Sequence, residues 1–155
     1  MINPFEILNP NCFMNIKNPK SKKMVYEVLC NKLYNDYKIN KSELLNELIE
    51  RDRKGFTTMG NGIATPYIQN NFIKKPICIV SVLSKGIDFD STDKIPIDVI
   101  FLLILPKINK SENLQTLAML SRLLRNTELI LKLRGSQSKD SSFAIITEYL
   151  KNRAA

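Results

Sequence analysis

The chain has 155 residues, of which 44% are hydrophobic, which is enough for one ordinary core, so we predict a single domain over residues 1–155. No apolar run approaches the roughly 18 to 20 residues that cross a bilayer, and the N-terminus lacks a secretion signal, so we expect a cytoplasmic protein without membrane insertion. The net charge of +8 favours acidic partners, and the absence of histidine excludes histidine zinc sites, histidine-dependent triads and a phosphohistidine.

The first half of the chain predicts a short strand and two helices. Residues 12–16 alternate weakly after an entry segment at 5–8, which predicts a strand. Ser21 can cap a helix that carries apolar side chains at helical spacing. Asn40, with Glu43 three residues later, resembles a capping box for a second helix, which we expect to end near residues 53–55. The apolar positions of the two helices are Val25, Val28, Leu29 and Leu33, then Leu44, Leu45, Leu48 and Ile49.

The second half predicts two buried strands followed by three helices. Residues 77–83 and 97–105 are continuously apolar and rich in β-branched side chains, as strands buried on both faces are. Residues 85–93 between them predict a polar turn. Ser111 and Thr127 can cap two helices, and a third lies near the C-terminus, so helices are expected on both sides of a small sheet. The stripe of the first helix is Leu114, Leu117, Ala118, Ser121 and Leu124, and that of the third is Phe143, Ile146 and Leu150. The second helix is short and is expected to run through Leu133.

Residues 60–67 read GNGIATPY and predict a loop that presents its last residue. Two glycines separated by one residue allow positive φ angles and close backbone approach, and Pro66 fixes the backbone before Tyr67. The alternative is a simple hairpin loop with an exposed tyrosine, because a GxG pair alone occurs in many turns.

Residues 51–67, RDRKGFTTMGNGIATPY, resemble the phosphoacceptor segment of the fructose, mannitol and nitrogen-regulatory family of enzyme IIA domains of the bacterial phosphotransferase system. Further matches lie at 85–90 (KGIDFD), 95–103 (IPIDVIFLL) and 113–125 (NLQTLAMLSRLLR), so the resemblance covers nearly the whole chain in order. It implies an α/β (α+β) fold, a three-layer α/β/α sandwich with a small mixed sheet flanked by helices.

The family segment ends in Pro-His, and a phosphocarrier protein delivers a phosphoryl group to that histidine. The resemblance places Tyr67 at the phosphoacceptor position, Arg51 at the phosphate-neutralising position and Asn113 at the position of a second family histidine. Phe56 and Thr58 depart from the family, which has small residues, serine and glycine, there. Further matching positions are Thr57, Gly60, Asn61, Gly62, Ala64 and Pro66, and of these we expect Thr57, the three GNG residues and Pro66 to belong to the binding site with Arg51 and Tyr67.

The missing histidine changes the expected chemistry. The family relay passes a phosphoryl group between histidines, whereas a phosphotyrosine is an ordinary ester whose onward transfer is strongly uphill, and no histidine base is present. We therefore expect no sugar phosphotransfer by the usual mechanism. The main hypothesis is a regulatory module of the nitrogen-regulatory type that binds a phosphocarrier, or a regulated kinase or transporter, through Tyr67 and Arg51.

Two other functions stay open. Tyr67 can be a phosphoacceptor within a relay, with Arg51 stabilising the added charge. Alternatively, the basic charge serves nucleic acids or anionic surfaces, although the densest basic cluster lacks aromatic interleaving and a helix-turn-helix pattern, so nucleic-acid binding is disfavoured. That cluster, which we expect to be a solvated loop, consists of Lys17, Lys20, Lys22 and Lys23.

Structural interpretations compete for several of these residues. Arg51 follows Glu47 at i, i+4 spacing and can form a surface pair, and Asn113 can serve only to cap a helix. Ser81 and Asp98 are expected to be structural. We expect no cofactor and no metal, because the aspartates of the polar turn lack a calcium-loop pattern, and we expect the cysteines to be buried reduced thiols. These residues are Asp88, Asp90 and Asp93, and Cys12, Cys30 and Cys78.

Overall fold

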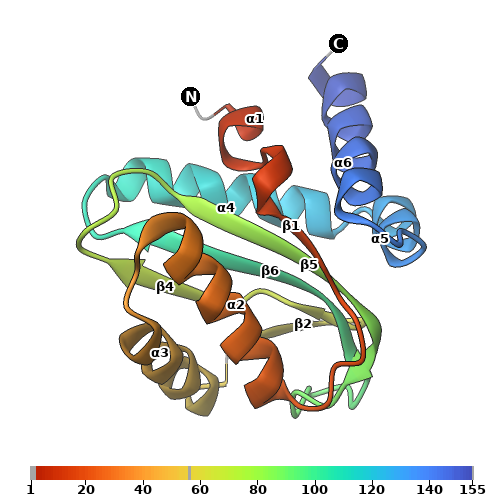
Figure 1. The fold of residues 1–155 in the computed structure, drawn as a ribbon. Coiled ribbons are helices and arrows are strands. Elements are labelled where there is room, and N and C mark those ends of the chain that lie inside the picture. Colours follow the sequence, from red (N-terminus) through yellow and green to blue (C-terminus); the bar gives the residue numbers. More distant parts are fainter. Residues whose placement is uncertain (1–2, 56, 155) are drawn as a thin grey trace.

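The computed structural model describes residues 3–55 and 57–154, which form one mixed six-stranded sheet with helices on both faces (Figure 1). The fold is therefore the predicted three-layer α/β/α sandwich. The elements in chain order are α1 (Pro4–Ile7), a 3-10 turn η1 (Pro10–Cys12), β1 (Phe13–Ile16), α2 (Lys22–Tyr37), α3 (Lys41–Arg53), β2 (Thr58–Gly60), β3 (Ile63–Ala64), β4 (Tyr67–Asn70), β5 (Ile77–Ile87), β6 (Ile97–Pro106), α4 (Lys110–Leu124), α5 (Thr127–Arg134) and α6 (Lys139–Ala154).

Strand β6 organises the sheet, whose order is β1-β5-β6-β3-β2, with β4 also paired to β6. Strand β5 runs antiparallel to β6, whereas β3 and β4 follow one another along its other edge and run parallel to it. The register aligns Ala64 with Ile100 and Tyr67 with Leu103. Among the described strands β4 pairs with β6 alone, so its outer side is a sheet edge.

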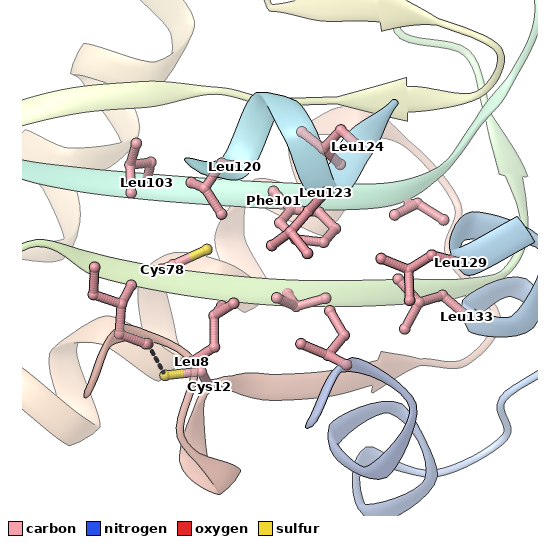
Figure 2. Packing of buried hydrophobic residues seen from close by; sticks show 14 of the residues in the cluster. Leu8, Cys12, Cys78, Phe101, Leu103, Leu120, Leu123, Leu124, Leu129 and Leu133 are labelled. Atoms are coloured by element: carbon pink, nitrogen blue, oxygen red, sulfur yellow. Dashed lines mark hydrogen bonds between the residues drawn. The ribbon is translucent and has the colours of Figure 1, made fainter. Parts of the chain in front are cut away.

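Two apolar layers enclose the sheet, which explains why β5 and β6 read as continuous apolar runs. Because side chains alternate along a strand, Phe101 and Leu103 of β6 face α4, α5 and α6, while Ile100 and Leu102 face α2 and α3. Figure 2 shows the first layer, where Phe101 lies among leucines of α4 and α5. All four side chains are at most 2% exposed, so both faces of the strand are buried.

The helix caps confirm half of the predictions. The side chains of Ser21 and Asn40 accept hydrogen bonds from the amides of Met24 and Glu43, as expected. The predicted caps Ser111 and Thr127 were wrong, because the cap positions of α4 and α5 are Asn109 and Asn126, two residues and one residue earlier. Asn109 precedes α4 in a left-handed conformation, and the Asn126 side chain caps α5 at the Leu129 amide.

The predicted apolar stripe of α4 was wrong in part, because Leu124 is buried and Leu117 packs against the core, but other members are exposed. Leu114 is 67% exposed and Ala118 is exposed, whereas Asn113 and Thr116 are buried. The buried face is thus turned by about one residue, or about 100°, from the predicted one. Its buried members are Asn113, Thr116, Met119, Leu120, Leu123 and Leu124.

Strand β5 is longer than predicted, since it runs through Ile87 rather than ending near Leu83. A register shift after Val82 lets Ile87 pair with Ile97 and bury its side chain, so part of the polar stretch belongs to the strand. The rest is a turn, as predicted: the Asp88 side chain accepts a hydrogen bond from the Asp90 amide.

The helices, the cysteines and the basic cluster can be compared with three further predictions. No helix within residues 3–55 and 57–154 is long and apolar enough to cross a bilayer. All three cysteines are buried free thiols, as predicted. The basic cluster is only partly a loop, because Lys17 and Lys20 are exposed between β1 and α2, while Lys22 and Lys23 open α2.

Candidate functional site

Tyr67 is the first residue of β4, and its position follows from the residues before it. The Pro66 carbonyl accepts a hydrogen bond from the Leu103 amide at 2.9 Å, which attaches this point of the chain to β6. Tyr67 is half-buried and packs against the apolar layer beneath α4. The tyrosine is thus held at the sheet edge with part of its side chain facing solvent.

Arg51, in the last turn of α3, covers the Tyr67 ring. Its guanidinium carbon lies 3.8 Å from the ring centroid, which is a cation–π contact worth about 0.5 to 2 kcal/mol. The alternative pairing with Glu47 is not formed in the structure, where no ion pair of the described residues includes Arg51. The structure therefore brings together the two residues that the sequence placed sixteen positions apart.

A groove of about 610 Å³ lies beside this stack, between α3 and the edge strand β4. Its charged side chains have both signs, with Glu47, Glu50 and Lys54 on or just after α3 and Lys107 just after β6. Glu50 is bound to Arg53 at 2.8 Å, so its charge is already compensated. The groove is therefore a mixed-charge surface whose cations are Arg51, Lys54 and Lys107.

Two exposed apolar side chains lie at the end of β4 and β6. The register pairs Asn70 with Pro106, and Phe72 and Ile108 each follow two residues later. They are 89% and 65% exposed, and Phe72 is more exposed than the other exposed large apolar side chains of the described residues, such as Leu114 at 67%. Exposed apolar side chains beside a groove are typical of protein interaction sites.

The GNG residues form a hairpin turn between β2 and β3. Gly60, Asn61 and Gly62 all have positive φ angles, as the spacing of the glycines predicted. The Asn61 amide donates to Asp93 Oδ2 at 2.9 Å, and its carbonyl accepts from the Arg134 guanidinium. These hydrogen bonds connect the hairpin to a distant loop and to α5 rather than to Tyr67.

Aspartates hold this turn in place. The amides of Asn61 and Ile95 donate to Asp93, and these hydrogen bonds lower the pKa of its carboxyl group. Asp98, expected to be structural, accepts two hydrogen bonds from Arg134 Nε at 2.9 and 3.0 Å. Within the described residues no cluster of three potential metal ligands occurs.

Thr57 contacts Asp52 rather than the Tyr67 ring. Its hydroxyl donates to Asp52 Oδ1 at 2.7 Å, and the buried Tyr26 hydroxyl donates to the same oxygen at 2.8 Å. Lys22 completes the cluster at 3.1 Å from Asp52 Oδ2. Burial, with the neighbouring Asp52 charge, raises the pKa of Tyr26 far above its usual value. Thr57 therefore helps to fix the end of α3 next to Arg51.

Asn113 is buried in the first turn of α4 and does not cap it. Its side-chain amide donates to the Pro106 carbonyl at 2.8 Å, which holds the end of β6, while its Oδ1 has no hydrogen-bond partner among the described residues. Asn113 does not line the groove beside Tyr67. Its observed contact is structural.

Comparisons with known proteins decide the family. The family described as "Phosphoenolpyruvate-dependent sugar phosphotransferase system, EIIA 2" matches residues 6–149. The chain belongs to this enzyme IIA family. A nitrogen regulatory protein of Bradyrhizobium diazoefficiens is 28% identical over 91% of this chain and 92% of its own length, and one of Pseudomonas aeruginosa is 28% identical over 96% and 97%. A fructose-specific EIIA component of Haloferax volcanii is 30% identical over 69% and 70%.

Solved structures of the enzyme IIA family share the fold. The nitrogen regulatory protein IIA-Ntr of Neisseria meningitidis superimposes with a TM-score of 0.80 at 23% identity, covering 90% of this chain and 96% of that one. Mannitol enzyme IIA of Escherichia coli, in its complex with phosphorylated mannitol enzyme IIB, gives 0.73 at 15% identity, covering 91% and 97%. The resemblance found in the sequence is thereby confirmed.

In this enzyme IIA family member, Arg51 and Tyr67 line the groove, and most of its other lining residues were not predicted from the sequence. Lys54, Gln69 and Lys107 carry no local motif. Only the parallel register of β4 on β6 brings Lys107 near Tyr67, and only the packing of α3 on β4 brings Lys54 there. The exposure of Phe72, next to this groove in sequence, is seen only in the structure.

Proposed function

We propose that this enzyme IIA family member is a regulatory protein-binding module of the nitrogen-regulatory type whose docking face centres on Tyr67 and Arg51. The observation that carries the proposal is the guanidinium of Arg51 stacked on the Tyr67 ring at the edge of the sheet. Tyrosine and arginine are, with tryptophan, the side chains most enriched among the residues that supply binding energy in protein interfaces. Exposed Phe72 and Ile108 extend this face with apolar surface.

The chemistry of the chain argues against a relay function. In this proposal Tyr67 occupies the phosphoacceptor position, and the chain has no histidine that could take its place or serve as its base. A phosphoryl group on a phenol is an ester and does not pass readily to another acceptor. The retained face can therefore recognise a partner without passing on a phosphoryl group.

The relatives support a regulatory rather than a transport role. Two of the relatives are nitrogen regulatory proteins, and each match covers more than nine-tenths of both chains. The mannitol enzyme IIA with the same fold was solved in complex with another protein, phosphorylated enzyme IIB. We propose a protein partner for this chain as well, and the phosphocarrier protein is the partner to test first.

Intact mass after incubation with phosphoenolpyruvate, enzyme I and the phosphocarrier protein tests the proposal. We expect the natural protein and Tyr67→Phe to gain no phosphoryl group, and Tyr67→His to gain one, because the docking face still presents position 67 to the carrier. Phosphorylation of the natural protein, lost in Tyr67→Phe, would contradict the proposal and support a tyrosine phosphoacceptor. No phosphorylation of any variant would contradict docking of this carrier.

Direct binding provides the second measurement. Titration of the isotope-labelled protein with the unphosphorylated phosphocarrier is expected to shift the amide signals of Tyr67, Gln69 and Lys107. Replacement of either Arg51 or Tyr67 by alanine should weaken binding about tenfold or more, since interface hot spots cost about 2 kcal/mol. Arg122→Ala, which removes an exposed arginine outside the groove, is the matched control. Equal weakening by the control would argue for a nonspecific charge effect.

A further inference from the structure

A second cleft lies on the other face of the sheet from α2 and α3, where α1, the end of α4 and the end of α6 meet. Figure 1 shows α1 and α6 at the same end of the molecule, with α4 running behind them. The cleft has a volume of about 520 Å³, within the range of about 300 to 1,000 Å³ that small-molecule sites occupy. It shares no lining residue with the groove beside Tyr67.

The floor of this cleft is apolar. Met119 and Leu123 of α4 and Leu150 of α6 line it, and each is less than 9% exposed. Tyr149 adds a half-buried aromatic side chain from α6. Such a floor can cover an alkyl or aryl group and remove it from water.

The rim of the cleft is cationic. Arg122, Arg125 and Arg153 are exposed and line the cleft, and none of them forms an ion pair with a carboxylate of residues 3–55 and 57–154. Arg153 instead lies over the Tyr149 ring, 5.3 Å from its centroid. By contrast, Arg53 and Arg134 are paired with carboxylates. Three uncompensated guanidinium groups around one apolar floor distinguish this cleft from the rest of the surface.

A purely structural role explains these arginines only in part. Cations near the end of a helix stabilise its dipole, so Arg122 in the last turn of α4 and Arg153 in that of α6 have such a role. That effect acts on each helix separately. It does not require cations from α4 and α6 to line the same cleft.

We propose that this cleft binds an organic anion that combines an apolar body with a phosphate or carboxylate head. The guanidinium group presents paired donors that match both heads, and the apolar floor takes the body. Neither part alone accounts for the site, because a free inorganic anion leaves the floor exposed and a neutral apolar molecule leaves the cations unpaired. The inference does not depend on the function proposed for Tyr67.

Titrations of the isotope-labelled full chain with three probes test this proposal. Octyl phosphate, kept below its micelle concentration, combines both parts; inorganic phosphate has only the head and octanol only the body. We expect octyl phosphate to bind at least about tenfold more tightly than either fragment and to shift the amide signals of Leu123, Asn126 and Tyr149. Octanoate in place of octyl phosphate then shows which head is preferred.

Charge-removing variants identify the groups responsible. Arg122→Gln and Arg153→Gln should each weaken octyl phosphate binding about fivefold to tenfold, because each removes one charge-assisted interaction. Arg53→Gln removes an exposed arginine that lines neither this cleft nor the groove beside Tyr67, and it should leave the affinity unchanged. A dispersed amide spectrum of each variant shows that it is folded, and the double variant extends the series if a single exchange is compensated.

Three results would overturn the proposal. Equal affinity for octanol and octyl phosphate would show that the arginines do not contribute. Equal affinity for inorganic phosphate and octyl phosphate would show that the apolar floor does not contribute. Binding of octyl phosphate that persists unchanged in the double variant, or amide shifts confined to other surfaces, would place the ligand elsewhere.

Discussion

Gly62 shows at the scale of one residue how a backbone position can depend on distant side chains. Its φ is +81°, and a Cβ atom there would lie 2.6 Å from Arg134 Nη2, 3.0 Å from Asp98 Oδ1 and 3.2 Å from the Pro96 carbonyl oxygen. The Arg134–Asp98 pair closes on this turn because the residue has no side chain. The glycine therefore serves both the left-handed turn and the pairing of two remote residues.

Gly62→Ala is expected to destabilise the protein more than the replacement of a left-handed glycine by alanine normally does. Strain at positive φ costs about 1 kcal/mol, and crowding against the Arg134–Asp98 pair should bring the total loss of unfolding free energy to about 2 to 4 kcal/mol. Gly55→Ala is the matched control, since its φ is +83° and nothing lies within 4 Å of its Cβ position. Urea unfolding of both variants measures the difference, and equal losses would contradict the crowding argument.

The sequence predicted the positive φ angles of this turn but not its partners. Glycines around an asparagine are typical of a left-handed turn, which is a local property. Arg134 lies 72 positions from Gly62 and carries no motif that points to it. The contact of Arg51 with Tyr67 was likewise expected only through a family resemblance, since residue types and spacing alone allowed a Glu47 pair.

At the scale of elements, Asp52 joins α2, the end of α3 and the segment that leads into β2. It accepts hydrogen bonds from Tyr26 and Thr57 and forms an ion pair with Lys22. Tyr26 is 1% exposed, so its hydroxyl depends on this carboxylate for a partner. Arg51, the residue that precedes Asp52 in the chain, makes the proposed docking contact.

Asp52→Ala should cost about 2 to 4 kcal/mol of unfolding free energy, because it leaves a buried hydroxyl and a partly buried ammonium group without their partner. Asp36→Ala is the control, since Asp36 forms only an i, i+4 surface pair with Lys32, worth about 0.5 kcal/mol or less. In Tyr26→Phe the removal of Asp52 should cost less, and a double-mutant cycle measures that coupling. Additive losses would show that the two side chains do not depend on each other.

The elements themselves were largely predictable, while their exact faces and ends were not. Caps at Ser21 and Asn40 came from local hydrogen-bonding rules and were correct. The α4 face was misjudged because polar Asn113 and Thr116 were not expected to be buried, whereas both are buried and donate hydrogen bonds to backbone carbonyls. The end of β5 depended on a register shift against β6, which is a non-local property.

At the scale of the whole molecule, the layers followed from two long apolar runs and the amphipathic segments around them. A strand that is apolar at nearly every position needs cover on both faces, so helices on both sides were predictable. The parallel attachment of β3 and β4 along one edge of β6 was not, because short strands of two to four residues give almost no pattern. That attachment brings Tyr67 and Lys107 to the same edge of the sheet as the exposed side chains of Phe72 and Ile108.

The burial of titratable groups in both layers predicts how stability changes in alkaline solution. Burial raises the pKa of Cys30 to about 11 from an ordinary value of 9.0, and raises that of Cys12 and, more strongly, of Cys78. Tyr26 behaves in the same way through burial and Asp52. Between pH 9 and 11 the unfolded chain therefore releases protons that the folded chain keeps, so unfolding becomes more favourable as the pH rises.

Each such thiol contributes fully to the free energy of unfolding below about pH 9, where it is protonated in both the folded and the unfolded chain. This contribution declines as the pH rises towards the pKa that the thiol has in the folded protein. The expected slope is about 1.4 kcal/mol per pH unit for each group that is ionised only in the unfolded chain. Denaturant unfolding under reducing conditions from pH 7.5 to 10.5 checks this. Cys30→Ala should lower the free energy of unfolding at pH 7.5, yet it should reduce the slope of its decline with pH by the contribution of about one group. An unfolding free energy that stays constant above pH 9 would mean that the thiols and Tyr26 gain access to water in the folded protein.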